Sequence, residues 1–243
     1  MIALLAAFQF LSILPPVIKR PFTPEELGQS VGFFPLVGLI LGGILVGANL
    51  LLDLVLPPAV AAVIVVALWV ALTRALHLDG LMDTCDGVFG GMTVKRRLDI
   101  MRDSRVGAFG VAGGVLALLA KTAAVASLNG QVVPLIMTAV LGRWAMSLAV
   151  ITFPYAREEG LGRAMKDHTG WKSLLLATVI AGLVAWSCGR CTGVIFAGGV
   201  VIIWLALSQF FVKWLGGLTG DTYGAICELI ECCVLIGYVA LNG

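Results

Sequence analysis

Residues 77–105, HLDGLMDTCDGVFGGMTVKRRLDIMRDSR, separate two long apolar parts of the chain and hold five of its fourteen acidic residues. If 77–88 is helical, Asp79, Asp83 and Asp86 stand at i, i+4 and i+7, on one face within an arc of about 60°. Clustered carboxylates repel one another unless a cation lies among them, and Mg²⁺ commonly bridges a few carboxylates to substrate phosphates. The stretch therefore predicts a metal-dependent phosphoryl-group chemistry.

The composition predicts an integral membrane protein. The chain of 243 residues is 60% hydrophobic and 12% charged, with a mean hydropathy of +1.03, whereas soluble domains carry about 25% charged residues. We expect one membrane domain over residues 1–243, an all-α polytopic helix bundle with about six to eight transmembrane helices. The formal charge of +2, without a basic patch interleaved with aromatics, argues against nucleic acid as a partner.

Hydropathy places seven apolar spans along the chain. They cover 31–52, 59–76, 106–128, 131–153, 174–188, 194–212 and 225–241. Residues 1–18 are apolar but stop at Pro15–Pro16, which is short for a crossing, so an interfacial or re-entrant segment fits them as well as a span. In the first span, Gly38 and Gly42 have the GxxxG spacing that lets two helices approach closely. The TPEE sequence at 23–26 is typical of a helix start.

The positions of the basic residues predict the orientation. If the 77–105 loop is cytoplasmic, alternation of the spans places nearly all other loop Lys and Arg on the same side. These are Lys19, Arg20, those of the 154–173 connection and Lys213. The opposite side keeps Asp53 and Arg190, as the positive-inside rule requires. We therefore expect a multi-pass protein of the cell inner (cytoplasmic) membrane with its active-site loop, about 77–105, facing the cytoplasm.

A second acidic pair follows the first. Asp99 and Asp103 are again four apart and predict a second helical stretch after the Gly90–Gly91 break. Arg102 and Arg105 lie beside this pair, where a guanidinium could clamp a diphosphate. The alternative for these residues is ordinary ion pairing on a surface helix.

Charged residues also fall inside the predicted spans. Arg143 stands near the middle of 131–153, where a charge is costly unless it meets a partner or a wet cavity. Its partner could be a carboxylate of the 77–105 motif or a substrate phosphate. Glu228 and Glu231 enter the last span and could pair with Arg143, with Lys121 or with a bound metal. Lys121 could instead snorkel toward the end of its helix.

Several motifs together resemble the cobalamin synthase family. They are FFPLVGLILG at 33–42, HLDGLMDTCDG at 77–87, RDSRVGAFG at 102–110, GRW at 142–144, YAREEGLG at 155–162 and GGLTGDTYGA at 216–225. They keep the family's order and span nearly the whole chain. The resemblance implies a membrane adenosylcobinamide-GDP ribazoletransferase acting in the late nucleotide-loop step of cobalamin biosynthesis. Such an enzyme uses Mg²⁺ to join adenosylcobinamide-GDP to α-ribazole, or its 5′-phosphate, and releases GMP.

This chemistry assigns a role to each candidate residue. The expected metal ligands are Asp79, Asp83, Asp86 and Asp103. The expected catalytic residues are Asp83 and Asp103, with Asp103 as proton acceptor. The expected substrate-binding residues are His77, Arg102, Arg105, Arg143, Asp221 and Glu228. For His77, a general acid–base role, a role as a ligand and a structural role at the helix start stay open.

Two other functions compete with this one. A CDP-alcohol phosphotransferase of phospholipid synthesis would share the chemistry and the D-x₃-D spacing at 79/83 and 99/103. A transporter would explain the charges inside the spans, but the two halves show no repeated motif and the acidic cluster lies at the membrane face. The expected partners are the two substrates and the lipid bilayer, and the oligomeric state is left open.

Overall fold

The computed structural model describes residues 1–242, which are mostly helical and contain no β-strand. The helices are α1 (Ile2–Leu11), α2 (Pro24–Ser30), α3 (Phe34–Leu52), α4 (Pro58–Leu72), α5 (Leu76–Gly90), α6 (Val94–Ile100), α7 (Ala108–Ala126), α8 (Val133–Thr152), α9 (Leu161–His168), α10 (Trp171–Leu215) and α11 (Gly220–Asn242). The predicted all-α class is confirmed. The helix start at TPEE is also confirmed, because Thr23 and Glu26 exchange the two hydrogen bonds of a capping box.

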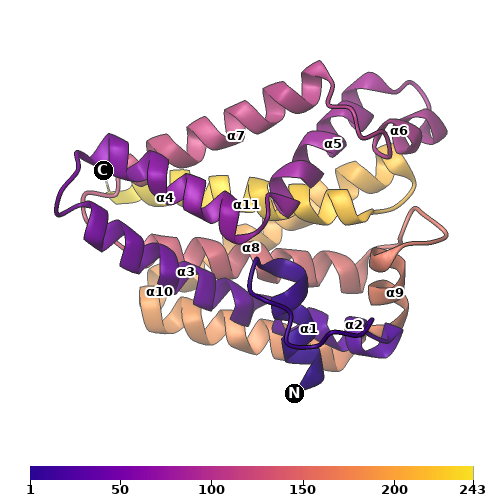
Figure 1. The fold of residues 1–243 in the computed structure, drawn as a ribbon, viewed down its shortest axis with the longest axis horizontal. Coiled ribbons are helices and arrows are strands. Elements are labelled where there is room, and N and C mark those ends of the chain that lie inside the picture. The colour runs from indigo at the N-terminus through magenta and orange to yellow at the C-terminus, as the bar shows by residue number, and fades with distance from the viewer. Residues whose placement is uncertain (243) are drawn as a thin grey trace.

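Helix α8 is the centre of the bundle. It is buried nearly from end to end, and α3, α10 and α11 pack around it (Figure 1). The contact with α3 depends on two glycines, because a Cβ at Gly38 would stand 2.4 Å from the carbonyl oxygen of Ala139 and one at Gly42 would stand 2.8 Å from Cα of Ile136. The close approach predicted from the GxxxG spacing is therefore confirmed.

The structure supplies the membrane crossings that hydropathy predicts. Among residues 1–242, five helical segments are long and apolar enough to cross a membrane, and α4 with α5, bent by 88°, makes a sixth candidate. The 45-residue α10 is two helices, because Arg190 has a φ of 47° and the chain turns back so that Gly193 meets the backbone of Ala185. Its two arms match the predicted spans 174–188 and 194–212. If the two arms are counted separately, the described residues contain seven candidate crossings, within the predicted six to eight.

The polar segments gather at one end of the bundle. The short helices α2, α6 and α9 lie toward the right of Figure 1, with α2 beside α9 and α6 above them, whereas the α3–α4 turn lies at the opposite end. Gly28 of α2 packs directly on the backbone of His168 at the end of α9. The polar connection over 154–173 contains the short helix α9. The 77–105 and 154–173 segments therefore lie at the same end of the bundle, as the alternation of the predicted spans requires.

Four charged side chains form a network inside the bundle. Lys121 of α7 donates to Glu228 at 2.6 Å and also to Glu231, and Arg143 of α8 pairs with Glu231. All four are buried. Because water does not reach these side chains, the two positive charges are stabilised by the two negative charges instead. The expected pairing of the two glutamates with Arg143 and Lys121 is confirmed. The snorkelling alternative for Lys121 is wrong, because its ammonium group has carboxylate partners within the bundle.

Glu231→Gln should destabilise the protein more than Glu228→Gln, because Glu231 serves two cations and Glu228 serves one. Removing one partner of a buried ion pair costs about 3–5 kcal/mol. We expect the thermal unfolding midpoint in detergent to fall most for Glu231→Gln. The control is Asp53→Asn in the exposed α3–α4 turn, which should change stability by less than about 0.5 kcal/mol. Equal midpoints for the three variants would contradict the network.

Candidate active site

Helix α5 carries three aspartates toward the end of the bundle that holds α6 and α9. Asp79 is exposed, Asp83 is half-buried and Asp86 is buried. The charge of Asp83 interacts with those of Asp79 and Asp86, and also with that of Asp221 at the start of α11. The helix predicted over 77–88 and its acidic face are thus confirmed. Carboxylates this close to one another favour a cation among them.

Asp221 reaches this cluster because α5 and α11 cross in close contact. A Cβ at Gly80 would stand 2.7 Å from the carbonyl oxygen of Asp221, and one at Gly224 would stand 3.1 Å from Cα of His77. Small residues at a crossing let two backbones touch. The crossing therefore sets Asp221, predicted only as a substrate-binding residue, beside the aspartates predicted to hold a metal.

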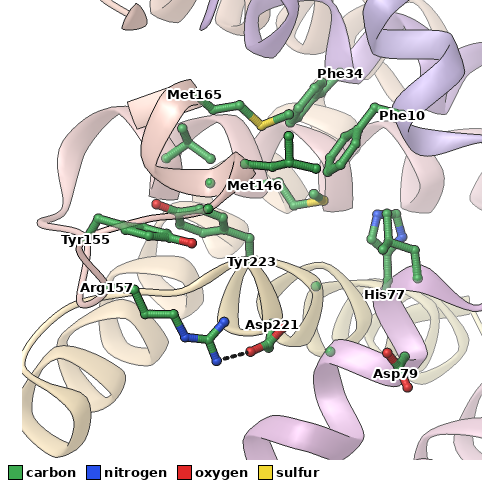
Figure 2. A pocket seen from close by; sticks show the side chains of 18 of the residues that line it. Phe10, Phe34, His77, Asp79, Met146, Tyr155, Arg157, Met165, Asp221 and Tyr223 are labelled. Carbon is green, nitrogen blue, oxygen red and sulfur yellow. Dashed lines mark hydrogen bonds and ion pairs between the residues drawn. The ribbon is translucent and has the colours of Figure 1, made fainter. Parts of the chain in front are cut away.

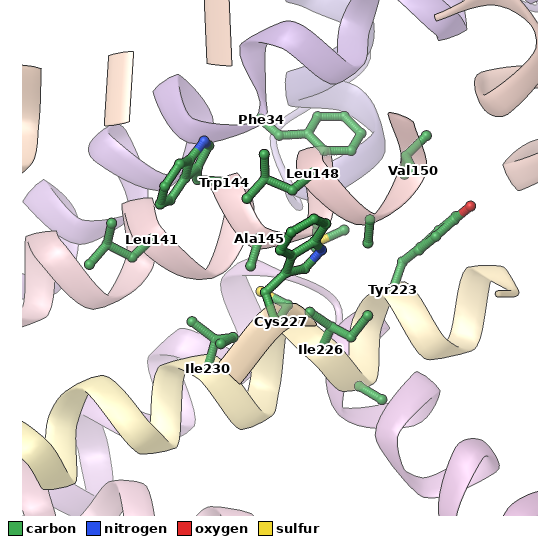
Figure 3. Packing of buried hydrophobic residues seen from close by; sticks show 14 of the residues in the cluster. Phe34, Leu141, Trp144, Ala145, Leu148, Val150, Tyr223, Ile226, Cys227 and Ile230 are labelled. Carbon is green, nitrogen blue, oxygen red and sulfur yellow. The ribbon is translucent and has the colours of Figure 1, made fainter. Parts of the chain in front are cut away.

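Arg157 is the cation that the structure places beside this cluster. Its guanidinium donates to Asp221 at 2.7 Å (Figure 2), and its charge also acts on Asp83. Two backbone hydrogen bonds of 2.8 Å join Pro154–Ala156 to Leu218 and hold the loop that carries it. This arginine lies in the YAREEGLG motif, but no spacing within the sequence marks it as a site residue.

Asp86 has partners of a different kind. Its carboxylate accepts the backbone N–H groups of Gly107 at 2.7 Å and Gly110 at 2.8 Å. These donors stand at the N-terminus of α7, where backbone N–H groups lack helical acceptors. A Cβ at either glycine would come within 2.5 Å of this carboxylate. Asp86 therefore docks α7 onto α5, and its role as a metal ligand stays a prediction.

A cavity of about 270 Å³ opens beside the crossing of α5 and α11; we call it the first cavity. One wall is apolar and the other is charged (Figure 2). The apolar wall includes Phe10, Phe34, Met146 and Met165, and the charged residues of the lining are Asp79, Arg157, Glu159 and Asp221. His77 stands at one end, with Tyr155 and Tyr223 at the other. Apolar walls with a few placed polar groups are typical of small-molecule sites.

A second cavity, of about 690 Å³, is partly lined by the same residues as the first. The two share Arg157 and Glu159. Helix α6 supplies Lys95 and adjoining residues to its lining, and Arg102 follows. Asp99, Glu158 and Glu159 also line it, so its charges are balanced. An anionic group would bind there through guanidinium groups such as that of Arg102, which is predicted to bind substrate. The site thus has two compartments with Arg157 on their border.

Comparison with known proteins decides the family. The family model for cobalamin-5-phosphate synthase matches residues 3–239. The chain belongs to this family. Relatives named adenosylcobinamide-GDP ribazoletransferase include those of Syntrophobacter fumaroxidans, 44% identical over 94% of both chains, and Desulforamulus reducens, 43% identical over 94% of this chain and 92% of its own. That of Pseudomonas aeruginosa PAO1 is 40% identical over 96% of both chains. No solved structure matches the chain.

Asp103 and Arg105 line neither cavity, and the same is true of Asp83 and Asp86. Helix α6 ends at Ile100, so the prediction that Asp103 stacks on Asp99 within one helix was wrong. Asp103 accepts the backbone N–H of Arg105 at 3.1 Å and pairs with its guanidinium at 2.7 Å, and local bonds of this kind compete with helix. The hydrogen bond from Arg105 lowers the pKa of Asp103 to about 2, which makes this carboxylate a weak proton acceptor at neutral pH.

Arg143 and Glu228, predicted to bind substrate, also line neither cavity. The structure gives both residues partners within the protein instead, in the network of Lys121 and Glu231. Arg143 approaches the first cavity only through His77, whose Nδ1 lies 3.3 Å from its Nη2 atom. His77 itself lines that cavity, where a substrate-binding residue is expected.

The carboxylates of α5 fit a magnesium ion that keeps water and phosphate ligands. Within residues 1–242, no three His, Cys, Asp or Glu side chains converge into a complete metal cage. Mg²⁺ seldom needs one, because it is usually held by one or two carboxylates together with substrate phosphates and water. Asp79 and Asp83 offer such oxygens on one helix face, within electrostatic reach of Asp221. They remain the predicted ligands.

Asp83→Asn and Asp86→Asn should have opposite effects. The amide of Asp86→Asn offers one oxygen where the carboxylate offered two, so one N–H at the start of α7 loses its acceptor at a cost of about 1–3 kcal/mol. Its unfolding midpoint should fall. Asp83→Asn relieves repulsion, so we expect an unchanged or higher midpoint together with loss of catalysis. Unfolding in detergent and a turnover assay measure both. Full activity of Asp83→Asn, or an unchanged midpoint of Asp86→Asn, would refute these roles.

Proposed function

We propose that this chain is an adenosylcobinamide-GDP ribazoletransferase. It joins adenosylcobinamide-GDP and α-ribazole, or its 5′-phosphate, to form adenosylcobalamin, or its phosphate, and releases GMP. The observation that carries the proposal is the carboxylate cluster with Arg157 at the border of two cavities. Transfer between two substrates needs two binding compartments whose reacting groups meet at one place. The name shared by the relatives supports the same reaction.

The second cavity suits the guanosine diphosphate part of the donor. It is the larger of the two, and Arg102 and Arg157 bring guanidinium groups to a lining that also holds Lys95 and the carboxylates of Asp99, Glu158 and Glu159. A diphosphate concentrates negative charge, and guanidinium groups can bind its oxygens in pairs. The corrin ring is far larger than either cavity, so it stays outside while the diphosphate enters.

In the proposed reaction, a hydroxyl of the acceptor ribose attacks the phosphorus attached to cobinamide. A new O–P bond forms, and the P–O bond to GMP breaks. The attacking hydroxyl is on the ribose ring, because the acceptor that carries a 5′-phosphate keeps it. Asp83, one helical turn along α5 from the cavity-lining Asp79, accepts the hydroxyl proton, and Arg157 stabilises the charge of the leaving phosphate. Mg²⁺, when bound by Asp79 and Asp83, would polarise the phosphate oxygens and neutralise their charge.

We also infer that the end of the bundle with α6 and α9 faces the cytoplasm and that the protein lies in the cell inner membrane. This end carries the KRR run at 95–97 and the basic residues of 154–173 (Figure 1). The opposite end keeps Asp53 and Arg190. The excess of Lys and Arg supports a cytoplasmic location of the two cavities.

The test is GMP release by purified protein given adenosylcobinamide-GDP, α-ribazole and Mg²⁺. We expect one adenosylcobalamin for each GMP, loss of both products with EDTA, and recovery when Mg²⁺ is restored. Asp53→Asn, at the far end of the bundle, should keep full activity, and Asp83→Asn should lose it. If the wild-type protein releases no GMP but transfers the phosphoalcohol of a CDP-alcohol, the phospholipid alternative is correct and this proposal is wrong.

A further inference from the structure

His77 lies between the buried ion network and the first cavity. Its side chain is 1% exposed, and its Nδ1 atom is 3.3 Å from Nη2 of Arg143. Its Nε2 atom is buried and has no hydrogen-bond partner among residues 1–242. The ring stands at the end of the cavity, near Phe10 (Figure 2). The orphaned nitrogen thus belongs to a side chain that lines the cavity.

Arg143 decides which nitrogen of His77 carries the hydrogen. A guanidinium has only donors, so the Nδ1 atom that faces it must accept. The neutral ring then carries its hydrogen on Nε2. Because Arg143 is itself held by Glu231, this arrangement is built into the bundle. His77 therefore offers the cavity a donor, and a ligand seated there should present an acceptor, since a buried N–H is costly to leave unpaired.

The size and walls of the first cavity narrow the choice of ligand. Its volume of about 270 Å³ lies just below the ~300–1,000 Å³ typical of drug-sized ligands. It suits one flat bicyclic ring, whereas a corrin or a complete nucleoside diphosphate would not fit. Phe10, Phe34, Met146 and Met165 line it, and aromatic rings and thioethers pack well on a flat aromatic ligand. The benzimidazole of α-ribazole is such a bicycle, with one unsubstituted ring nitrogen that accepts a hydrogen bond.

We propose that His77 selects the base of the acceptor substrate, an inference that rests on the function proposed above. The benzimidazole occupies the first cavity, and Nε2–H of His77 donates to its unsubstituted ring nitrogen. The ribose is attached to the other ring nitrogen, which leaves it free to reach the carboxylates. Asp79 and Asp221 line this same cavity. In this arrangement His77 binds and discriminates, and it does not take the proton of the attacking hydroxyl.

The test compares α-ribazole with its indole analogue, in which a C–H group replaces the accepting nitrogen. With adenosylcobinamide-GDP saturating, GMP release gives kcat/KM for each acceptor. We expect the wild-type protein to prefer α-ribazole by about ten- to a hundredfold, because the analogue leaves Nε2–H unpaired. In His77→Leu this ratio should fall to near one. The control is Tyr223→Phe, which removes a buried hydroxyl that also lines this cavity and has no hydrogen-bond partner among the described residues. This variant should keep the preference of the wild-type protein for α-ribazole over the indole analogue.

The outcomes separate this inference from the proposed function. Equal use of both acceptors by the wild-type protein overturns the role of His77 and leaves the function intact, even if His77→Leu does not fold. A preference that persists in folded His77→Leu also overturns it. Failure of the wild-type protein to release GMP with either acceptor overturns the proposed function and this inference together.

Discussion

The close crossing of α5 and α11 is the constraint on which the site depends. Gly80 leaves room for no side chain against the backbone of Asp221, and Gly224 is almost as close to His77. The crossing brings the acidic face of one helix to the first turn of another, within reach of Arg157. A larger residue at either glycine would separate the two helices. Asp79 and Asp221 would then no longer line the first cavity together.

Two clusters of charge in this bundle are balanced in opposite ways. In the buried network, Lys121 and Arg143 compensate Glu228 and Glu231, so this cluster is neutral without any ligand. At the site, the aspartates of α5 and Asp221 outnumber their cation. Excess negative charge beside the guanidinium groups of Arg102 and Arg157 is what a divalent cation and a diphosphate complement together. His77 connects the two clusters, because Arg143 of the network fixes the hydrogen that it offers to the cavity.

Spacing along single helices accounts for most of what could be predicted from the sequence. The aspartates at 79, 83 and 86 fall on one face, and Gly38 with Gly42 permits the contact with α8, because both features depend only on helical geometry. The common end of the polar loops follows from the alternation of spans. The prediction for Asp103 failed because it extended a helical period beyond Ile100, where the side chain bonds to the backbone of Arg105 instead.

Contacts between distant segments could not be predicted in this way. Arg157 and Asp221 are 64 positions apart, and Arg143 and Glu231 are 88 apart. No spacing rule links such pairs, so the sequence alone does not tell whether Arg143 binds a phosphate or a carboxylate. The structure decides for a carboxylate. The position of Arg157 could not be predicted for the same reason. Its loop is held in place by the strand-like pairing of Tyr155 with Leu218, two residues that are far apart in the sequence.

The central claim is that the acidic face of α5 holds a divalent cation against a bound diphosphate. Equilibrium dialysis of Mn²⁺ tests it most directly, with adenosylcobinamide-GDP at equal free concentration on both sides of the membrane. We predict that the wild-type protein retains Mn²⁺ when the donor is present and that folded Asp83→Asn does not. Equal retention by the two proteins, or none by the wild-type protein, would contradict the claim.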